Sequence, residues 1–318
     1  MSPRAAGGTP ASLLLGLDAG ATHVRAAVAN AAGRVLGRGE AGPANPYALG
    51  APAADRARRQ AIAAALRQAH AAARAVRAVV VGSAGVSESG AARDVARRTR
   101  AAFPGARVAV LTDGEIAQVG GLAGGPGIVV IAGTGSIVWG RNRRGEWARA
   151  GGWGWLLGDE GSGQWLGRLG YAAALRALDG SGRRTALLPA LQRSLRLRSS
   201  AGLARLPRPT TPAEFGALAP LVLAAAAGGD AVARELVGRG AADLARQTAA
   251  VAHRLRLRRP RVAYGGSVLT SGPVLRRALQ RALRVELPGA RLFPPAGDAL
   301  DGALRLAREL ASGPPPRG

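Results

Sequence analysis

The stretch 127–140 has the sequence Gly-Ile-Val-Val-Ile-Ala-Gly-Thr-Gly-Ser-Ile-Val-Trp-Gly. Its uninterrupted apolar run predicts a buried strand over 127–132, and the glycines that follow predict a tight turn. A second apolar run predicts another strand over 137–142. The whole stretch is therefore expected to form a strand hairpin with a glycine-rich turn.

A hairpin of the same kind lies near the start of the sequence. Strands are predicted over 12–18 and 23–30. The turn between them is Asp18-Ala19-Gly20-Ala21-Thr22, and a third strand is predicted over 34–41. Because both halves open with a strand hairpin and a turn of small residues, the sequence indicates a duplicated α/β lobe with a cleft between the copies.

The remaining patterns complete the two lobes. The first half continues with helix 52–75, which places Ile62, Leu66 and His70 on one face, strand 76–82, helix 89–102, strand 108–112 and helix 115–122. The second half continues with helices within 164–257, strand 261–264, helix 273–283, strand 291–293 and helix 297–311. We therefore place an N-terminal lobe at 11–122, a C-terminal lobe with helical insertions at 123–312, and loose tails at 1–10 and 313–318.

The composition excludes several kinds of chemistry. The 318 residues contain no cysteine, which excludes disulfides, thiolate nucleophiles, cysteine zinc sites and iron–sulfur clusters. The cytoplasm is the expected location, and no apolar run approaches the ~18–20 residues of a membrane span. Lysine is also absent, so a Walker-type lysine, a Schiff base and a lysine general base are excluded. The scattered His23, His70 and His253 are each expected to be structural.

The formal net charge of +25 raises the possibility of a nucleic-acid partner. All 44 basic residues are arginine, however, and the chain is rich in alanine, glycine and proline, as is typical of genome-wide compositional bias. The arginines are spread through the chain, although they are denser in 176–208 and 254–261. We therefore expect a solvated basic surface and no nucleic-acid or membrane partner.

The turn from Asp18 to Thr22 is a candidate phosphate site. The small residues Gly20 and Ala21 let backbone amides approach phosphate oxygens, and the Thr22 hydroxyl can donate a hydrogen bond. Asp18 can hold a magnesium ion directly or through water. An ordinary hairpin turn has the same composition, so this motif is ambiguous on its own.

Two further turns follow predicted strands in the second half. Gly133-Thr134-Gly135-Ser136 would form a second cradle of backbone amides for phosphate. Gly265-Gly266-Ser267 would let a nucleotide base or ribose lie against the backbone. Plain turns remain the alternative for each. However, the turn at 133–136 and the turn at 18–22 occupy equivalent places in the two lobes, which favours a shared function. In such sheets ligands bind at the carboxyl ends of strands.

Asp113 comes directly after the predicted strand 108–112. A carboxylate at this place can cap the helix that follows. It can also accept the proton of an attacking hydroxyl as a general base. In company with the phosphate turns, we favour the general base.

The loop 151–163 has the sequence Gly-Gly-Trp-Gly-Trp-Leu-Leu-Gly-Asp-Glu-Gly-Ser-Gly. Aromatic faces suit the apolar faces of a sugar, and Asp159 can bind sugar hydroxyls. Because a glycine-dense loop is costly to order, a ligand role is favoured for Trp153 and Asp159. Glu160 would contact sugar or cap the next helix, whereas Trp139 and Trp165 are expected in the core.

Asn45 is a further candidate for contact with sugar. It lies between two prolines in Gly42-Pro43-Ala44-Asn45-Pro46. Its amide can both donate to and accept from sugar hydroxyls. A plain Asx-type turn is the alternative.

The order of these motifs resembles a known family. Asp-x-Gly-x-Thr is followed by Gly-Pro-Ala-Asn, Thr-Asp, Ala-Gly-Thr-Gly-Ser and Gly-Gly-Trp-Gly-x-x-x-Gly-Asp-Glu-Gly-Ser. This order resembles the N-acetylglucosamine kinase family, which is grouped with the BadF/BadG/BcrA/BcrD-type ATPases in the actin/hexokinase superfamily. The resemblance covers about residues 12–310 and is most specific over 131–163. It implies a two-lobed actin/hexokinase-like (ribonuclease H-like) α/β fold with a central cleft, ATP and Mg²⁺ as cofactors, and a homodimer.

The resemblance also implies a role for each motif. The implied catalytic base is Asp113. The implied nucleotide and phosphate residues are Asp18, which also holds the metal, Gly20, Ala21, Thr22, Gly133, Thr134, Gly135, Ser136, Gly265, Gly266 and Ser267. The implied sugar-binding residues are Asn45, Asp113, Thr134, Trp153 and Asp159.

Some features depart from the family pattern. Ala19 and Ala21 stand where the first loop is usually richer in glycine, and His23 stands where lysine or arginine is common. The third loop lacks a distinctive signature. The absence of cysteine excludes two relatives in the superfamily, the activators of radical dehydratases and the glucokinases with a cysteine zinc motif.

The resulting hypothesis is an ATP-dependent kinase that phosphorylates the 6-hydroxyl of N-acetylglucosamine or a close relative, a small-molecule substrate. Glucosamine, N-acetylmuramic acid and glucose remain alternative substrates. Two alternatives come from other classes of protein. One is a non-catalytic sugar sensor on the same fold, which Asp113 and the phosphate turns disfavour. The other is a basic protein that binds nucleic acid.

Overall fold

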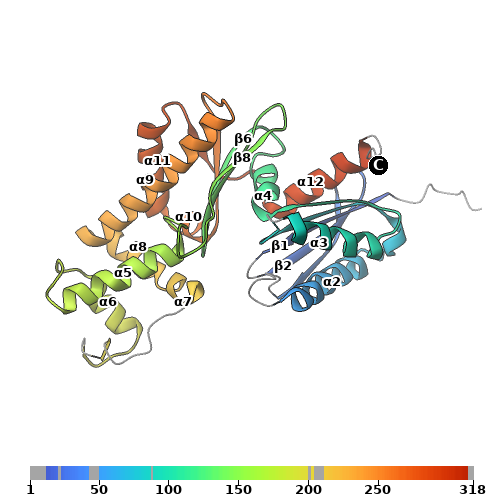
Figure 1. The fold of residues 1–318 in the computed structure, drawn as a ribbon. Coiled ribbons are helices and arrows are strands. Elements are labelled where there is room, and N and C mark those ends of the chain that lie inside the picture. The colour runs from blue at the N-terminus through green and yellow to red at the C-terminus, as the bar shows by residue number, and fades with distance from the viewer. Residues whose placement is uncertain are drawn as a thin grey trace, which may run out of the picture. The chain divides into compact units, whose positions relative to one another are not determined.

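The computed structural model describes residues 12–20, 23–42, 50–86, 89–199, 202–203 and 211–313. These residues form two compact units. The first lies within 1–125 and 296–318, and the second lies within 126–295. In Figure 1 the first unit is coloured from blue to teal and ends with the red helix α12, and the second is coloured from green to orange-red.

The first unit is built on a five-stranded sheet. Its strands are β1 (Leu13–Ala19), β2 (Val24–Ala29), β3 (Val35–Ala41), β4 (Val76–Ser83) and β5 (Arg107–Thr112). Their order is β3-β2-β1-β4-β5. The first three strands are antiparallel to one another, whereas β4 and β5 run parallel to β1. The predicted hairpin and the predicted strands at 76–82 and 108–112 are therefore confirmed, and the structure shows that the latter two run parallel to β1.

Helices cover both faces of this sheet, and the alternation of side chains along β1 explains why. Leu13, Leu15 and Leu17 lie in one core with helices α2 (Ala51–Gln68) and α3 (Ser89–Ala102). Leu14 lies in the opposite core with helices α4 (Asp113–Gly121) and α12 (Ala299–Ser312). Because both faces are buried, β1 is an apolar run.

The placement of α12 differs from the division that we predicted from the sequence. That division put the last helix into a C-terminal lobe ending at 312, whereas α12 belongs to the first unit. Its residues Ala303 and Ala307 are fully buried in the core formed with β1, β4 and α4. Arg107 donates hydrogen bonds to the carbonyls of Leu310 and Gly313, so Gly313 is held by the unit and is not part of a loose tail.

The second unit is built on another five-stranded sheet. Its strands are β6 (Gly127–Ala132), β7 (Ser136–Arg141), β8 (Trp147–Gly151), β9 (Arg261–Gly265) and β10 (Arg291–Phe293). Its helices are α5 (Gly163–Leu178), α6 (Leu187–Ser194), α7 (Pro212–Gly216), α8 (Ala219–Ala227), α9 (Ala231–Arg254), α10 (Ser267–Thr270) and α11 (Pro273–Glu286). Side chains from these helices other than α7, and from β6, β7, β8 and β9, form one continuous core.

The two sheets have the same topology. The order β8-β7-β6-β9-β10 matches β3-β2-β1-β4-β5, with three antiparallel strands followed by two parallel ones. The predicted duplication of an α/β unit is thus confirmed. Its consequence is that β1 and β6 occupy equivalent central positions, and the turns that follow them are equivalent too.

One local prediction was wrong, and one strand was missed. Helix 52–75 ends at Gln68, because His70 adopts a left-handed conformation with φ of 49° and the Ala71 amide donates back to the Leu66 carbonyl. His70 therefore does not extend the helix face of Ile62 and Leu66. Strand β8 was not predicted, since its segment combines tryptophan, arginine and glycine without apolar alternation.

None of the described helices is by itself long and apolar enough to span a membrane. The pair 212–227 and 231–254 meets the length and composition test together, but it is bent by 113°.

Candidate functional site

The two acidic candidates of the first unit lie at one edge of its sheet. Strands β1, β4 and β5 run parallel, and their register pairs Ala19 with Ser83 and Ser83 with Thr112. Asp18 therefore lies at the carboxyl end of β1, and Asp113 directly follows the end of β5. This edge is where α/β sheets bind ligands.

Asp113 is not the cap of the helix that it begins. The cap of α4 is Thr112, whose hydroxyl accepts a hydrogen bond from the Glu115 amide at 3.2 Å. Glu115 returns the contact by accepting from the Thr112 amide at 2.8 Å, which completes a capping box. The alternative of Asp113 as a helix cap is thereby removed, and its carboxylate needs another explanation.

The environment of Asp113 makes its ionised form costly. Burial raises the pKa of this carboxyl above its ordinary value, although the Gly114 amide donates to Oδ1 at 2.9 Å and lowers it in part. The negative charge of Asp18 also raises the pKa of Asp113. A carboxylate with a raised pKa is a stronger proton acceptor, as a general base requires.

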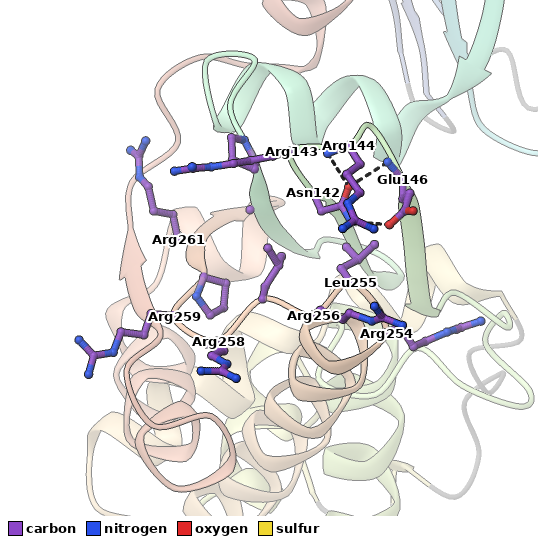
Figure 2. Close-up of a pocket in the computed structure, with 14 residues that line it drawn as sticks. Asn142, Arg143, Arg144, Glu146, Arg254, Leu255, Arg256, Arg258, Arg259 and Arg261 are labelled. Carbon is purple, nitrogen blue, oxygen red and sulfur yellow. Dashed lines mark hydrogen bonds between the residues drawn. The ribbon is translucent and has the colours of Figure 1, made fainter.

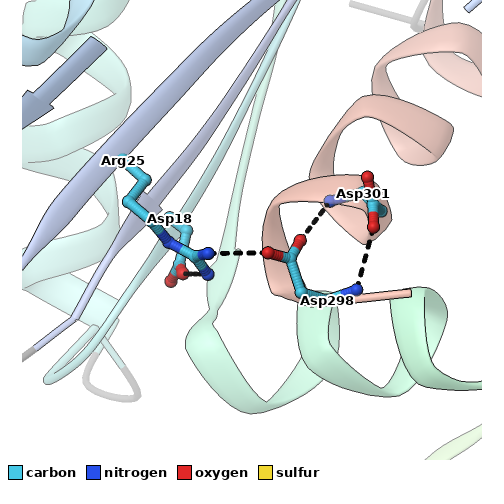
Figure 3. A network of polar contacts seen from close by, with 4 residues as sticks. All are labelled: Asp18, Arg25, Asp298 and Asp301. Carbon is cyan, nitrogen blue, oxygen red and sulfur yellow. Dashed lines mark hydrogen bonds and ion pairs between the residues drawn. The ribbon is translucent and has the colours of Figure 1, made fainter. Parts of the chain in front are cut away.

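Asp18 belongs to a network that joins two distant parts of the first unit (Figure 3). Arg25 lies directly opposite Asp18 in the β1–β2 pair and binds its Oδ2 at 2.7 Å. The other terminal nitrogen of Arg25 binds Oδ2 of Asp298 at 2.6 Å. Asp298 caps α12, forming a capping box with Asp301.

The pKa values of the two carboxylates in this network are shifted in opposite directions. Burial raises the pKa of Asp18 above its ordinary value despite the hydrogen bond from Arg25. For Asp298 burial also acts upward, but the Asp301 amide and Arg25 outweigh it and hold the pKa below its ordinary value. Arg25 keeps its charge, because its two carboxylate partners outweigh the effect of burial on its pKa. Asp298 therefore ionises more readily than Asp18, and both carboxylates bind Arg25.

A close contact between helices brings Asp298 into place. A Cβ atom on Gly302 of α12 would lie 1.9 Å from the Ile116 carbonyl of α4, and one on Gly120 of α4 would lie 1.8 Å from the Asp298 carbonyl. Only glycine allows the two backbones to approach so closely. The sequence of α12 thus fixes where its N-terminus lies.

Parts of two predicted motifs lie outside the described residues. This applies to Ala21 and Thr22 of the first turn and to Asn45 of the predicted sugar contact. Of the first turn, the Gly20 amide donates to the His23 carbonyl at 3.0 Å.

In the second unit the structure brings the turn after β6 together with the acidic loop. The Ser136 amide donates to Oδ1 of Asp159 at 3.2 Å. The Gly163 amide donates to the Gly133 carbonyl at 2.7 Å, and the Gln164 amide donates to the Thr134 carbonyl at 3.2 Å. Two motifs that are about 25 residues apart in the sequence therefore form one structure.

Not all four amides of this turn are free to meet a phosphate. The Gly133 amide donates to the Gly135 carbonyl at 2.9 Å, and the Ser136 amide is taken by Asp159. The amides of Thr134 and Gly135 form no hydrogen bond with the part of the chain that is described. Of the amides predicted to bind phosphate, those of Thr134 and Gly135 therefore remain available.

The third turn lies beside the second. Gly266 has a φ of 81°, and a Cβ atom there would lie 2.3 Å from the Ala132 carbonyl. A Cβ atom on Gly133 would lie 3.9 Å from the Ser267 nitrogen. Because β6 and β9 are parallel neighbours, their following turns meet at the carboxyl edge of this sheet.

Asp159 is held in an unusual conformation. Its φ is 59°, in the left-handed region that non-glycine residues seldom occupy, and such strain is concentrated at functional positions. Burial raises the pKa of its carboxyl above the ordinary value, which the Ser136 amide offsets in part. Glu160 accepts from the Gln247 side chain of α9 at 2.9 Å. Glu160 is not the helix cap either, because Ser162 fills that place.

The tryptophans separate as the sequence indicated. Trp139 and Trp165 are 8% and 6% exposed and fill the core. Trp153 is 67% exposed, with the Arg149 guanidinium 4.9 Å from its ring centroid. Arg149 therefore covers part of one ring face, while most of the Trp153 side chain stays exposed.

Two residues of the Asp18 network were missed in the sequence analysis. Arg25 is the one charged residue in the otherwise apolar strand Val24–Ala29, opposite Asp18 in the hairpin register. Asp298 is the first residue of an Asp-x-x-Asp capping pattern before the last helix. Both signals are present in the sequence, but only the fold shows that they meet.

Comparison with known proteins shows which family and which proteins this sequence resembles. The sequence model of the BadF/BadG/BcrA/BcrD ATPase family matches residues 15–300. An N-acetylmuramic acid/N-acetylglucosamine kinase from Clostridium acetobutylicum is 31% identical over 235 residues, 73% of this chain and 77% of that protein. An N-acetyl-D-glucosamine kinase from Dictyostelium discoideum is 33% identical over 188 residues, 57% of this chain and 59% of that protein.

Solved structures agree with these sequence matches. A proposed N-acetylglucosamine kinase from Chromobacterium violaceum has a TM-score of 0.76 at 32% identity, covering 94% of this chain and 100% of that chain. A ROK family glucokinase from Streptomyces griseus, in complex with glucose and AMPPNP, has a TM-score of 0.59 at 21% identity, with coverage of 94% and 100%. The second similarity concerns the fold alone.

Proposed function

This chain belongs to the BadF/BadG/BcrA/BcrD ATPase family, and from this premise we propose that it is an ATP-dependent kinase of amino sugars. The observation that carries the proposal is the state of Asp113. Its carboxylate follows β5 at the ligand edge of the sheet, is released from capping by Thr112, and has a raised pKa. The names of the relatives support N-acetylglucosamine or a close relative as the acceptor.

Asp113 is the proposed general base. It would accept the proton of the 6-hydroxyl as that oxygen attacks the terminal phosphorus of ATP, the bond to the leaving ADP oxygen breaking in the same displacement. The proton would then rest on the Asp113 carboxyl. The first turn, Gly20 to Thr22, and the amides of Thr134 and Gly135 would bind phosphate oxygens. Catalysis of this kind depends mainly on positioning and electrostatic stabilisation.

Mg²⁺ is the proposed metal, and Asp18 its protein ligand. Magnesium in phosphoryl-transfer sites usually keeps several waters and takes one or two carboxylates together with the phosphates. No group of three or more metal-binding side chains occurs among the described residues, and the single carboxylate of Asp18 fits this sparse arrangement. When bound, the ion would neutralise phosphate charge during transfer. Arg25 would keep Asp18 aligned.

The proposed sugar contacts are Asp159, Trp153, Thr134 and Asn45. Asp159 has a carboxylate for sugar hydroxyls, and Trp153 offers an exposed ring for an apolar sugar face. The loop Gly265 to Ser267 is the proposed nucleotide contact, because it lies beside the turn after β6 at the carboxyl edge of the sheet. We further propose a cytoplasmic homodimer.

A second acceptor, N-acetylmuramic acid, is favoured by one specific observation. The relative from Clostridium acetobutylicum carries both sugars in its name. Glucosamine and a non-catalytic sugar sensor are the remaining alternatives. A sensor would bind sugar without consuming ATP.

A coupled assay of ADP release tests the proposal. ATP and magnesium are supplied with N-acetylglucosamine, N-acetylmuramic acid, glucosamine or glucose in turn, and sugar binding is followed in parallel by calorimetry. We expect ADP release that depends on an N-acetylated sugar. Release with glucose alone would contradict the choice of substrate, and sugar binding without ADP release would establish the sensor instead.

A further inference from the structure

A pocket lined by arginine lies in the second unit. Its volume is about 760 Å³, and half of its 14 lining residues are arginines. In the whole chain only 44 of 318 residues are arginine, so the lining is strongly enriched. The seven arginines are Arg143, Arg144, Arg254, Arg256, Arg258, Arg259 and Arg261. All of them are exposed. We call this feature the arginine pocket.

Two segments far apart in the sequence supply these side chains (Figure 2). Arg143 and Arg144 lie in the turn between β7 and β8. The other five lie at the end of α9, in the segment that follows it and at the start of β9. Two separate walls of positive charge therefore face one hollow, which a single charged helix face would not produce.

The alternation of leucine and arginine after α9 fixes this geometry. Leu255 is 4% exposed and belongs to the core of the unit, and Leu257 packs against the same core. With Leu255 buried and Leu257 half-buried, Arg254, Arg256 and Arg258 lie at the surface. The guanidinium of Arg254 donates to the Arg149 carbonyl at 3.1 Å. The segment is thus anchored, and its charges do not depend on a flexible tail.

The positive charge of the pocket is not neutralised. Glu146 is the one acidic residue in the lining, and Asn142 donates to its carboxylate at 2.6 Å. None of the seven arginines forms an ion pair with a carboxylate in the described ranges. Seven like charges around one hollow repel each other, and a bound anion would relieve that repulsion.

The arginine pocket is separate from the candidate site of the same unit. The pocket includes Gly127 at the start of β6, whereas the turn at Gly133 follows the end of that strand. Six residues of strand at about 3.3 Å each place roughly 20 Å between the two ends. An anion in the pocket therefore does not occupy the proposed place of the ATP phosphates.

We propose that the arginine pocket binds a compact oligophosphate, an anion with two or more linked phosphoryl groups. Guanidinium groups match phosphate oxygens with two parallel hydrogen bonds, and arginines on two walls can hold neighbouring phosphoryl groups at once. A nucleic-acid strand fits less well, because its binding sites usually add aromatic rings that stack on bases, and no lining residue is aromatic. At this one place the expectation of a merely solvated basic surface is revised.

Calorimetry with inorganic tripolyphosphate tests the proposal on the full chain at about 150 mM salt, where weak surface attraction is largely screened. The test variant is Arg143→Gln/Arg144→Gln/Arg258→Gln. The matched control, Arg184→Gln/Arg193→Gln/Arg198→Gln, removes three exposed arginines from the same unit, away from the pocket. Circular dichroism verifies that both variants fold.

We expect the Kd for tripolyphosphate to rise about tenfold or more in the test variant and to change less than about twofold in the control. Orthophosphate should bind more weakly than tripolyphosphate to the unmodified protein. Equal weakening in both variants would mean diffuse charge attraction and overturn the site. Unchanged binding in the test variant would place the anion elsewhere and overturn it too. Tighter, pocket-dependent binding of a single-stranded oligonucleotide would overturn the class of ligand.

Discussion

At the scale of single residues, Asp113 combines burial with a charge that the proposed chemistry needs. Burial raises its pKa above the ordinary aspartate value of 3.8. Ionised Asp113 is therefore a cost to the folded state, which is present in full above its folded pKa and disappears below its unfolded pKa. Functional sites often carry such costs.

The first prediction concerns this cost. Asp113→Asn removes the buried charge, so the variant should be more stable than the unmodified protein at neutral pH. The difference should shrink as the pH falls through the raised folded pKa and should vanish below the unfolded pKa, where the Asp113 carboxyl is protonated in both states. Thermal unfolding of both proteins from pH 4 to pH 8 measures it. A variant that is less stable at neutral pH would show that the Asp113 charge is compensated.

Asp298 leads to a prediction of the opposite sign. Burial raises the pKa of Asp298, but the Asp301 amide and Arg25 together outweigh burial and hold the pKa below its ordinary value. Its contribution to stability is therefore present above the unfolded pKa and lost as the pH falls through the folded pKa. Asp298→Ala should lower the free energy of unfolding at neutral pH by about 1–2 kcal/mol through loss of the cap.

A conservative variant separates the cap from the charge. Asp298→Asn keeps a capping side chain but removes the ion pair with Arg25. We expect most of the stability to return, while the pH dependence of unfolding near the acidic limb weakens. Denaturant titrations of both variants at two pH values provide the comparison. Equal losses of unfolding free energy in Asp298→Ala and Asp298→Asn would contradict a capping role.

The residues that the sequence alone could identify are those at strand ends. Asp18, Asp113 and the turns after β6 and β9 follow apolar runs, so their position at the ligand edge follows from the period of the pattern. Arg25 and Asp298 could not be paired, because 273 residues separate them. The amides of Gly133 and Ser136 were expected to be free for phosphate. The Gly133 amide is occupied within the turn by the Gly135 carbonyl, and only the fold shows that Asp159 occupies the Ser136 amide.

At the scale of elements, the contact of α4 with α12 controls the candidate site of the first unit. Gly120 and Gly302 let the two helices approach, and Asp298 at the start of α12 reaches Arg25 as a result. The sequence predicts both helices, but helix periodicity contains no information on which helices will touch. The missed β8 and the early end of α2 have local causes, a weak alternation in one and a left-handed histidine in the other.

Gly302→Ala tests this contact. The added methyl would lie 1.9 Å from the Ile116 carbonyl, and relief by backbone movement should cost about 1–3 kcal/mol of unfolding free energy. Gly238→Ala in α9 is the matched control, since a Cβ atom there meets nothing within 4 Å. The control should stabilise the protein by about 0.5–1 kcal/mol, because alanine is the better helix former. Similar effects of both substitutions on chemical denaturation would argue against the contact.

At the scale of the whole molecule, the chain forms most of its first unit, then the second unit, and returns to complete the first with α12. Leu300 and Leu304 of this helix are 2% and 7% exposed, and they form a core with Ala27 and Ala29 of β2. The folding of the first unit therefore depends on residues at both ends of the sequence. Such long-range contacts are what a division of the sequence into consecutive lobes cannot anticipate.

Removal of residues 296–318 tests this dependence. Without α12, one face of the first sheet keeps only α4 as cover, so the amides of β1 and β4 should lose much of their protection against hydrogen exchange. The amides of β6 and β9 should keep theirs, because the core of the second unit contains no residue of α12. Loss of protection in both units alike would show that they fold as a single cooperative structure.

The most direct test of the central claim is detection of the product. ATP, magnesium and N-acetylglucosamine are incubated with the unmodified protein or with Asp113→Asn, the phosphorylated sugar is identified by phosphorus NMR, and sugar binding is measured by calorimetry. A phosphomonoester on the 6-hydroxyl is expected from the unmodified protein. Its rate of formation should fall by about 10²–10⁴-fold in the variant, the usual contribution of a general base, while sugar binding is retained. Turnover by Asp113→Asn at a rate near that of the unmodified protein would contradict the assignment of Asp113 as the base.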